Sequence, residues 1–393
     1  MKTVRLREGK ERSLLRRHPW VFAGSVDKGG GDSGETVRVQ AADGRFLAWA
    51  AYSPRSQIRL RVWSFDEAEH VDAAFLERRI AAAVALRTRL PIASDGVRLI
   101  HGEADGLPGL IVDRYGELLC AQFLSAGTER WKGAIADALL AATGCARLYE
   151  RSDSGVRTLE GLAPVTGWLR GDGTTGVTIR EHGWRLAVDV AQGHKTGYYL
   201  DQRDNRARFA ELVRRFGAQR VLNCYCYTGG FTVAALAGGA AEVMSVDSSA
   251  PALERARAHV ADNGFDAARA GFADADVNAY LREQLKAEAR FDAIVLDPPK
   301  FAPTAAHAER AARAYKDINR LALKLLAPGG LLFTFSCSGG VGAELFHKIV
   351  AGAGIDAGVD GALLARLEAA CDHPTTLFFP EGEYLKGLAI LSR

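Results

Sequence analysis

One stretch of the 393-residue chain decides the fold: VLNCYCYTGGF, residues 221–231. It begins with a short apolar run, as in a buried strand, and continues through a Thr-Gly-Gly turn into an apolar helical segment, 231–236. A strand-to-helix turn at the carboxyl end of a parallel sheet is where α/β folds bind nucleotide-like ligands. Because glycine lets the backbone approach a ligand closely, we predict a ligand-binding turn here.

The rest of the C-terminal half alternates short apolar runs with helical segments. Short apolar runs that alternate with helices indicate a parallel sheet covered on both faces. Two more strand candidates, 375–379 and 385–391, are close in sequence and are expected to form an antiparallel edge hairpin. The predicted fold class is therefore α/β, a Rossmann-like, mostly parallel sheet with an antiparallel edge hairpin. Its other predicted elements are strands at 220–223, 242–246, 292–296 and 331–335, and helices at 251–263 and 311–326.

Asp247 ends the next predicted strand, 18 residues after Gly229, where this architecture places the acidic residue that bonds ribose hydroxyls. An aspartate there could also cap the helix that starts near Pro251, and both roles are compatible. A dinucleotide site would need G-x-G-x-x-G around a pyrophosphate, but Tyr227 stands at the first glycine position. S-adenosylmethionine has no phosphate, so the turn favours it over NAD as the cofactor. The predicted cofactor-binding residues here are Asn223, Tyr225, Tyr227, Thr228, Gly229 and Asp247.

Asp297-Pro298-Pro299-Lys300-Phe301 follows the apolar run 293–296 and so lies at the carboxyl end of a central strand. The two prolines hold the backbone extended and stiff. A rigid loop can present Asp297 and main-chain carbonyls to the amino edge of a flat heterocycle, although Pro-Pro can also be a simple loop exit. We predict a catalytic and cofactor-binding role for Asp297, and substrate contacts from Pro298, Pro299 and Lys300.

Cys337 follows the next strand, within FTFSCSG at 333–339, and is expected close to Asp297. A lone cysteine is more often a core residue, but small polar neighbours indicate an exposed turn. Methylation of pyrimidine carbon 5 requires a thiolate, because attack on carbon 6 makes carbon 5 nucleophilic. We predict that Cys337 is this nucleophile and that Asp297 bonds N3 and N4 of cytosine. The group that takes the carbon-5 proton stays open, with Glu381 and Glu383 considered.

Charge is concentrated near the start of the chain. Residues 1–65 carry 13 lysines and arginines against 6 aspartates and glutamates, a net charge of +7 in a chain whose total is +3. A basic module on a slightly acidic body predicts a polyanionic partner, although a chance surface bias is the alternative. Trp20 is expected in the core of this module. The predicted strands of the basic module are 36–40, 45–52 and 58–65. A helix predicted at 71–90 leads to a second, α+β unit. The predicted elements of that unit are strands at 98–100, 109–114, 118–124 and 147–150 and a helix at 129–142.

Other classes of protein are not favoured. The six cysteines are sparse and lack zinc-site spacing, so no metal is predicted. The charged residues 1–13 lack the apolar region of a secretory signal, and no stretch has the roughly 18 apolar residues of a membrane helix. We therefore expect a cytoplasmic protein that does not associate with a membrane.

Further motifs extend over the chain: LLRRHPWVF (14–22), YSP (52–54), SQIR (56–59), GEADGLPG (102–109), HKTGYYLDQR (194–203) and YLKG (384–387). With the Asp-Pro-Pro-Lys-Phe and Phe-Ser-Cys-Ser-Gly segments, they resemble the ribosomal RNA large-subunit methyltransferase I family. The family consists of cytosine-5 methyltransferases that act on 23S ribosomal RNA. The match covers nearly the full length of the chain.

The resemblance implies three domains: a PUA-like RNA-binding domain (1–70), a central α+β domain (71–185) and a class I methyltransferase domain (186–393). It implies that Cys337 is the nucleophile and that Gln202, within a segment across the methionine end of the donor, contacts the cofactor. RNA binding is expected to rest on phosphate contacts from the basic module, with Arg16 and Arg17 among the substrate-binding residues.

Two positions depart from the family pattern. Most RNA cytosine-5 methyltransferases carry a second cysteine near the place of Lys300, so product release lacks an obvious actor here. The family also has an acidic residue where Ala275 falls; Asp276 is taken as the adenine contact, with Asp274 as the alternative.

Two other functions stay open. An Asp-Pro-Pro-aromatic loop also serves methylation of base amino groups, which needs no cysteine, and a non-catalytic RNA-binding protein could keep the same modules. The exact nucleotide, the choice between naked RNA and assembled subunits, and the oligomeric state, a homodimer included, also stay open.

Overall fold

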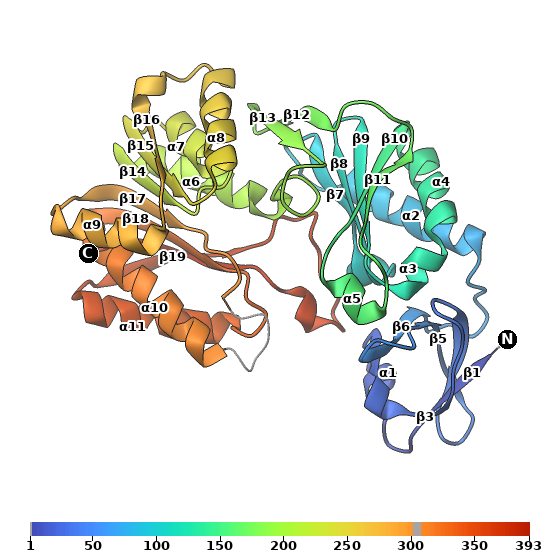
Figure 1. The fold of residues 1–393 in the computed structure, drawn as a ribbon. Coiled ribbons are helices and arrows are strands. Elements are labelled where there is room, and N and C mark those ends of the chain that lie inside the picture. The colour runs from blue at the N-terminus through green and yellow to red at the C-terminus, as the bar shows by residue number, and fades with distance from the viewer. Residues whose placement is uncertain (1, 302–307) are drawn as a thin grey trace. The chain divides into compact units, whose positions relative to one another are not determined.

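The computed structural model describes residues 2–301 and 308–393 (Figure 1). The chain divides into two compact units. Unit 1 comprises the chain up to Arg180, Val188–Leu200 and Cys371–Gly382, and unit 2 comprises Glu181–Ala187, Asp201–Ala370 and Glu383–Arg393. None of the described helices combines the length and apolar character needed to cross a bilayer.

The N-terminal part of unit 1 is a six-stranded sheet in the order β2-β6-β5-β4-β1-β3. Trp20 is only half-buried, so the prediction that it lies in this module's core is wrong. Side chains alternate across a strand, and Val21 takes the inward position on the edge strand β2. Trp20 instead packs against Phe379, with ring centroids 4.6 Å apart, and donates to Glu103 Oε1 at 2.7 Å. The elements are β1 Thr3–Leu6, α1 Arg12–Leu15, β2 Trp20–Phe22, β3 Val26–Gly29, β4 Thr36–Gln40, β5 Phe46–Tyr52 and β6 Ile58–Ser64.

The second part of unit 1 is a five-stranded sheet in the order β11-β10-β9-β8-β7, against which α2 and α4 pack. The helix expected at 129–142 is two helices, α3 and α4, which meet at Trp131. A two-stranded sheet of β12 and β13 follows, and its residues Glu181–Ala187 belong to unit 2. The elements are α2 Ala73–Arg87, β7 Gly96–His101, β8 Leu110–Tyr115, β9 Leu118–Phe123, α3 Ala126–Arg130, α4 Lys132–Thr143, β10 Arg147–Ser152, α5 Val156–Glu160, β11 Val165–Arg170, β12 Gly176–Glu181 and β13 Trp184–Asp189.

Unit 2 is built on a seven-stranded sheet in the order β16-β15-β14-β17-β18-β20-β19. The first five strands run parallel and β20 is antiparallel to both neighbours, which confirms the predicted fold class. The strands are β14 Arg220–Cys224, β15 Glu242–Asp247, β16 Ala270–Asp274, β17 Phe291–Leu296, β18 Leu326–Ser336, β19 Gly361–Glu368 and β20 Lys386–Ser392; the helices are α6 Arg203–Phe216, α7 Gly230–Ala237, α8 Ala250–Asp262, α9 Val277–Lys286, α10 Ala308–Leu325 and α11 Ala343–Ala357.

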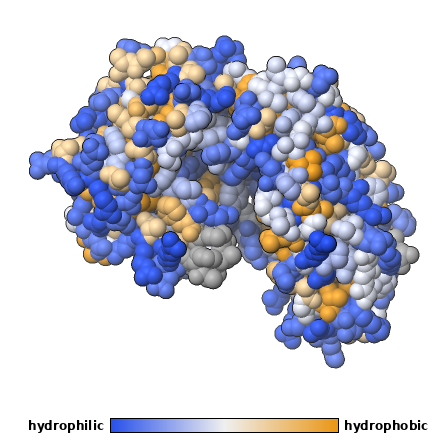
Figure 2. All heavy atoms as spheres, in the orientation of Figure 1, coloured by the Kyte–Doolittle hydropathy of each residue, from blue (hydrophilic) through white to orange (hydrophobic). Residues whose placement is uncertain are grey.

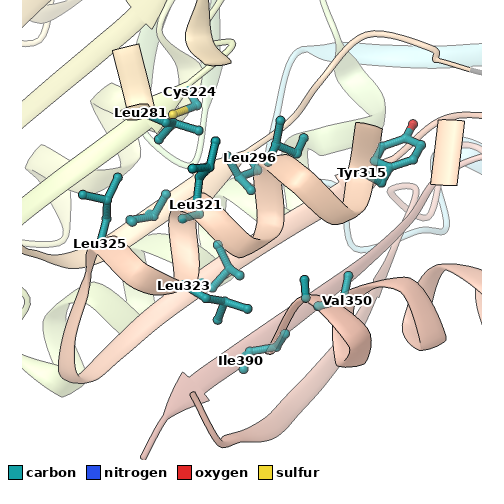
Figure 3. Packing of buried hydrophobic residues seen from close by; sticks show 14 of the residues in the cluster. Cys224, Leu281, Leu296, Tyr315, Leu321, Leu323, Leu325, Val350 and Ile390 are labelled. Carbon is teal, nitrogen blue, oxygen red and sulfur yellow. The ribbon is translucent and has the colours of Figure 1, made fainter. Parts of the chain in front are cut away.

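Helices cover both faces of this sheet (Figure 1). Along β17, Ala293 and Val295 pack with residues of α6 and α7, whereas Ile294 and Leu296 pack with residues of α9, α10 and α11. Figure 3 shows part of the second group, in which Leu321 of α10 lies near Leu296. Because both faces are buried, the central strands are continuously apolar, which is the pattern that the sequence displays.

The prediction of a strand at 375–379 is wrong. Within unit 1 these residues form a turn, in which Leu377 is 94% exposed. The strand that pairs with β20 is β19, whose sequence GALLARLE is mostly half-buried or exposed. An edge strand has only one hydrogen-bonded neighbour and tolerates charged residues, so its sequence carries little of the apolar signal that marks the central strands.

Candidate active site

The turn between β14 and α7 has a strained backbone. Tyr225 and Tyr227 have φ values of 58° and 48°, in the left-handed region that tyrosine rarely adopts, and Gly229 follows at 77°. The neighbouring strand holds this conformation, because the backbone N–H of Cys226 donates to the Val246 carbonyl at 3.1 Å. At Gly229 a β-carbon would lie 2.8 Å from Cβ of Ala256, so only glycine fits. Strain of this kind is concentrated at functional sites.

Asp247, at the end of β15, holds the turn from the side. Its Oδ2 accepts a hydrogen bond from the Tyr227 N–H at 2.8 Å, and its Oδ1 accepts one from the Ser249 N–H at 3.0 Å. Helix α8 is capped by Ser249, so the carboxylate itself is not the helix cap. A carboxylate oxygen can accept more than one hydrogen bond, so Asp247 can also accept one from a ligand hydroxyl.

Several buried side-chain donors in unit 2 have no hydrogen-bond partner among the described residues. They include Thr228 Oγ1 and Gln202 Nε2, on side chains that are only 5% and 2% exposed, and Thr334 Oγ1 within β18. A buried polar group without a partner is destabilising by about 1–3 kcal/mol, so each such group needs an explanation, and a ligand that supplies the missing acceptor is one. The other ends of Thr228 and Gln202 are fixed, because the Thr228 carbonyl accepts from His259 Nδ1 at 2.7 Å and Gln202 Oε1 accepts from Asn205 at 2.6 Å.

His259 is a neutral imidazole, and it holds Thr228 in place through a hydrogen bond. Burial lowers the pKa of His259, although the carbonyl groups of Thr228 and Ala187 near its ring nitrogens oppose this. Its Nε2 accepts from the Ala187 N–H at 2.8 Å, which leaves Nδ1 as the donor to Thr228. The turn is therefore anchored to α8 and β13 without a buried charge.

Asn223 lies beneath the turn. It is buried, and its side-chain amide donates to Thr232 Oγ1 at 3.0 Å; that hydroxyl lies 2.7 Å from Ser245 Oγ. This network joins β14, α7 and β15, so Asn223 shapes the turn from the sheet side.

Asp276 lies at the exposed start of α9 and caps it, with Oδ1 accepting from the Ala279 N–H at 2.8 Å. The preceding Ala275 N–H donates to the Asp247 carbonyl at 3.0 Å. The loop that carries Asp276 is therefore next to the end of β15, on the same sheet edge as the turn. The exposed Asp274 ends β16, in register with Asp247.

The ends of β17 and β18 bring Cys337 to the Asp-Pro-Pro-Lys loop. These strands are parallel neighbours, with Leu296 in register with Thr334. Asp297 is half-buried directly after β17, Pro298 is buried, and Pro299 and Lys300 are exposed. Cys337 Sγ lies 4.0 Å from the Pro298 carbonyl oxygen. A thiol, a carboxylate and a stiff loop therefore meet at one edge of the sheet.

Cys337 differs from most of the other cysteines in its exposure. Cys120, Cys145, Cys224 and Cys226 are buried, and burial raises the pKa of Cys120, Cys224 and Cys226. Thiols in such surroundings are inert. Cys337 and Cys371 are partly exposed, and Cys337 is the one in unit 2. The thiol beside the Asp-Pro-Pro-Lys loop is thus accessible to a reactant.

Two residues from other elements hold the turn after Cys337. Tyr315, on α10, has its hydroxyl 2.9 Å from Ser338 Oγ, and Lys386, at the start of β20, donates from Nζ to the Ser338 carbonyl at 2.8 Å. Burial raises the pKa of Tyr315, so it remains protonated. The sequence identified Lys386 only as a member of the YLKG motif, and it gave no signal for Tyr315.

Asp201 of the HKTGYYLDQR motif and Tyr384 of the YLKG motif meet in unit 2. Tyr384 donates its hydroxyl to Asp201 Oδ2 at 2.6 Å, and the Asp201 carbonyl accepts from the Ala370 N–H at 2.8 Å. These bonds place the segment that carries Gln202 beside the chain that leads into β20. The contact between Asp201 and Tyr384 joins residues 183 apart, and the sequence did not predict it.

The basic module belongs to unit 1. Arg16 and Arg17 are exposed there, and the Arg17 guanidinium lies 5.8 Å from the centroid of the Phe65 ring. Figure 2 shows that polar and charged residues cover most of the visible face. Glu381, considered above as a base, also belongs to unit 1 and lies 3.3 Å from His18 Nε2. Among the described side chains, no group of three or more His, Cys, Asp or Glu is arranged to hold a metal ion.

Comparisons with known proteins agree with this geometry. A family profile of S-adenosylmethionine-dependent methyltransferases matches residues 161–375, and one of PUA-like domains matches residues 4–65. The chain is 48% identical over 392 residues to ribosomal RNA large subunit methyltransferase I of Shewanella denitrificans, covering 98% of both chains. It is equally similar to the Salmonella newport protein of that name, covering 98% of this chain and 96% of the other.

Two solved structures share the fold over their full lengths. One is described as a candidate S-adenosylmethionine-dependent methyltransferase from Streptococcus mutans, with a TM-score of 0.85 and 20% identity. The other is described as a candidate methyltransferase complexed with SAH, with a TM-score of 0.86 and 21% identity. Each comparison covers 100% of this chain and 100% of the other. The likeness of fold therefore extends over the whole chain.

Proposed function

Since the chain belongs to the ribosomal RNA large subunit methyltransferase I family, an S-adenosylmethionine-dependent family, we propose that it methylates carbon 5 of a cytosine in 23S ribosomal RNA. As a member of that family it is a ribosomal RNA methyltransferase. The observation that supports the choice of carbon 5 is Cys337, a partly exposed thiol 4.0 Å from the Pro298 carbonyl of the Asp-Pro-Pro-Lys loop.

The residues around the β14–α7 turn fit S-adenosylmethionine, which supplies the methyl group from its sulfonium. Asp247 would accept hydrogen bonds from the ribose hydroxyls, and Asp276 would contact the edge of the adenine ring. Thr228 Oγ1 and Gln202 Nε2 are buried donors that lack a partner among the described residues, as expected where a polar ligand binds. Gly229 keeps the backbone accessible, while Tyr225, Tyr227 and, from beneath, Asn223 fix the shape of the turn.

The proposed chemistry belongs to Cys337 and Asp297. The Cys337 thiolate forms a bond from Sγ to carbon 6, and the electron pair of the carbon 5–carbon 6 double bond becomes available at carbon 5 to take the methyl group. A general base or water then takes the proton from carbon 5, the double bond re-forms and the carbon–sulfur bond breaks, which returns Cys337 as thiolate. Asp297, at the end of β17, would bond the N3 and N4 edge of cytosine and stabilise charge on the ring. Pro298, Pro299 and Lys300 would contact the base and its phosphate.

Methylation of an amino group is the alternative that the Asp-Pro-Pro-Lys loop also allows. Two readouts separate the alternatives: digestion of methylated RNA to nucleosides, and release of tritium from RNA labelled at cytosine carbon 5. Carbon-5 methylation yields 5-methylcytidine and releases the label. Formation of N4-methylcytidine with the label retained would reject the proposed chemistry, and the absence of any transfer would support a non-catalytic RNA-binding protein.

Thr228→Val tests the donor site. Valine keeps the size of the side chain and removes a hydroxyl without a described partner, so the free energy of unfolding should stay the same or rise slightly. The affinity for S-adenosylmethionine, measured by calorimetry, is expected to fall about tenfold. Thr334→Val, at an equally buried and unpartnered hydroxyl within β18, is the matched control and should bind normally. Equal affinities for all three proteins would remove Thr228 from the site.

RNA binding is expected to weaken steeply with salt, because lysine and arginine contacts to phosphate release counterions. The measured quantity is the slope of a plot of log K for RNA binding against the logarithm of the salt concentration. In the double variant Arg16→Gln/Arg17→Gln, the magnitude of this slope should be smaller by about 2. The control is Arg214→Gln/Arg215→Gln, an exposed arginine pair on α6. A salt response that is flat in the wild type, or equal in the two variants, would count against phosphate contacts at Arg16 and Arg17.

A further inference from the structure

Lys386 lies beside Cys337 in the sheet. It begins β20, and the antiparallel register places it directly opposite Ser336, the residue before the cysteine. Its Nζ donates to the carbonyl of Ser338, the residue after the cysteine, at 2.8 Å. Lys386 therefore contacts the residues on both sides of Cys337, through its backbone register with Ser336 and its side-chain bond to Ser338, although it is far from them in sequence.

This lysine is half-buried and lacks an acidic partner. Among the residues that the structure describes, Lys386 forms no salt bridge with a carboxylate, and the hydrogen-bond acceptor of its Nζ is a neutral carbonyl. Removing an ammonium group from water is unfavourable unless an anion compensates for it. The thiolate of Cys337 is an anion that can do so.

The charges around the turn agree with this pairing. Burial lowers the pKa of Lys386, the electrostatic interaction with Cys337 raises it, and the interaction with Lys300 lowers it. Asp297 directly follows the neighbouring strand β17, and a carboxylate disfavours a second anion nearby. Tyr315, from α10, contributes a neutral hydroxyl to Ser338. Lys386 is thus a cation that offsets the effect of Asp297.

We propose that Lys386 is a positioning residue for Cys337: its ammonium group stabilises the thiolate, and its bond to Ser338 holds the cysteine turn in place. The inference rests on the proposed function to the extent that the thiolate is the form that attacks carbon 6. In the free protein the thiol proton goes to solvent, so the ionisation of Cys337 is measurable without RNA or donor.

The test is the pH dependence of the rate at which iodoacetamide alkylates Cys337 in the full chain, followed on its peptide by mass spectrometry. Lys386→Met removes the charge and the hydrogen bond, Lys386→Gln removes the charge but keeps a donor, and Lys386→Arg keeps the charge. The midpoint is expected to rise by about one pH unit in the Met and Gln variants and to stay near the wild-type value in the Arg variant. Lys348→Met, at an exposed lysine paired with Glu344, is the control and should match the wild type.

A folded Met or Gln variant with the wild-type midpoint would overturn the proposal, and so would an Arg variant shifted as far as the Met variant. The Gln variant keeps the test decisive if the Met variant unfolds, since it can still donate to Ser338. Because the assay contains no RNA, its outcome is independent of the proposed function, which fails separately if the wild-type enzyme makes no 5-methylcytidine.

Discussion

Replacing Cys337 with alanine is expected to reduce the turnover of RNA methylation by about 10⁴-fold or more, because the bond to carbon 6 can no longer form. Cys337→Ser should lose nearly as much, since a hydroxyl is far less ionised than a thiol at neutral pH. The measurement is transfer of the labelled methyl group to 23S ribosomal RNA under single-turnover conditions. The affinity for S-adenosylmethionine should be unchanged, because Cys337 is not among the residues proposed to bind the donor.

Cys371→Ala is the matched control, as it replaces the other partly exposed cysteine. It should keep wild-type turnover. If Cys337→Ala still produces 5-methylcytidine at a rate within tenfold of the wild type, the covalent mechanism is excluded. Loss of activity in both variants would point to an effect of cysteine replacement on folding, which circular dichroism would detect.

Asp247→Asn is expected to weaken the binding of S-adenosylmethionine about 100-fold. The two carboxylate oxygens accept from Tyr227 N–H and Ser249 N–H, whereas an asparagine offers one oxygen and one NH₂ group. One of the two backbone donors therefore loses its acceptor, and the strained conformation of Tyr227 loses support. The ribose hydroxyls also lose a charged acceptor. Calorimetric titration measures the change directly.

The control for Asp247 is Asp262→Asn, which makes the same change at an exposed position at the end of α8. At saturating donor concentration, Asp247→Asn should recover most of its turnover, because the role proposed for Asp247 is to bind the donor and not the reacting base. An affinity within threefold of the wild type would show that Asp247 serves only the fold of the turn.

The sequence predicted the centre of unit 2 well and its periphery poorly. Strands β14, β15, β17 and β18 are buried on both faces, so their apolar runs mark them clearly. Helix α6 was not predicted, because its sequence RDNRARFAELVRRF is rich in charge. Arg206 on this helix is nevertheless buried, in a pair with Glu181 at 2.6 Å, and such pairing is invisible in a linear pattern.

Some residues of the candidate site could likewise be predicted from the sequence, and others could not. Residues adjacent to their strand ends, such as Asp247, Asp297 and Cys337, could be predicted because a parallel sheet brings the carboxyl ends of its strands to one edge. The place of Lys386 depends on the register of an antiparallel strand, which the sequence does not determine. The left-handed backbone of Tyr225 could not be predicted, because tyrosine has no intrinsic preference for it.

Strand β20 comes after β19 along the chain, yet it lies between β18 and β19 in the sheet. During synthesis, both flanking strands leave the ribosome before the strand that separates them. A nascent chain that ends before Lys386 therefore exposes two unsatisfied strand edges, which can pair with each other or with another chain. The insertion of β20 also delivers Lys386 to Cys337. The turn that carries Cys337 thus gains its bond from Lys386 in the same late step that closes the sheet, so truncated products would have neither a finished sheet nor a finished turn after β18.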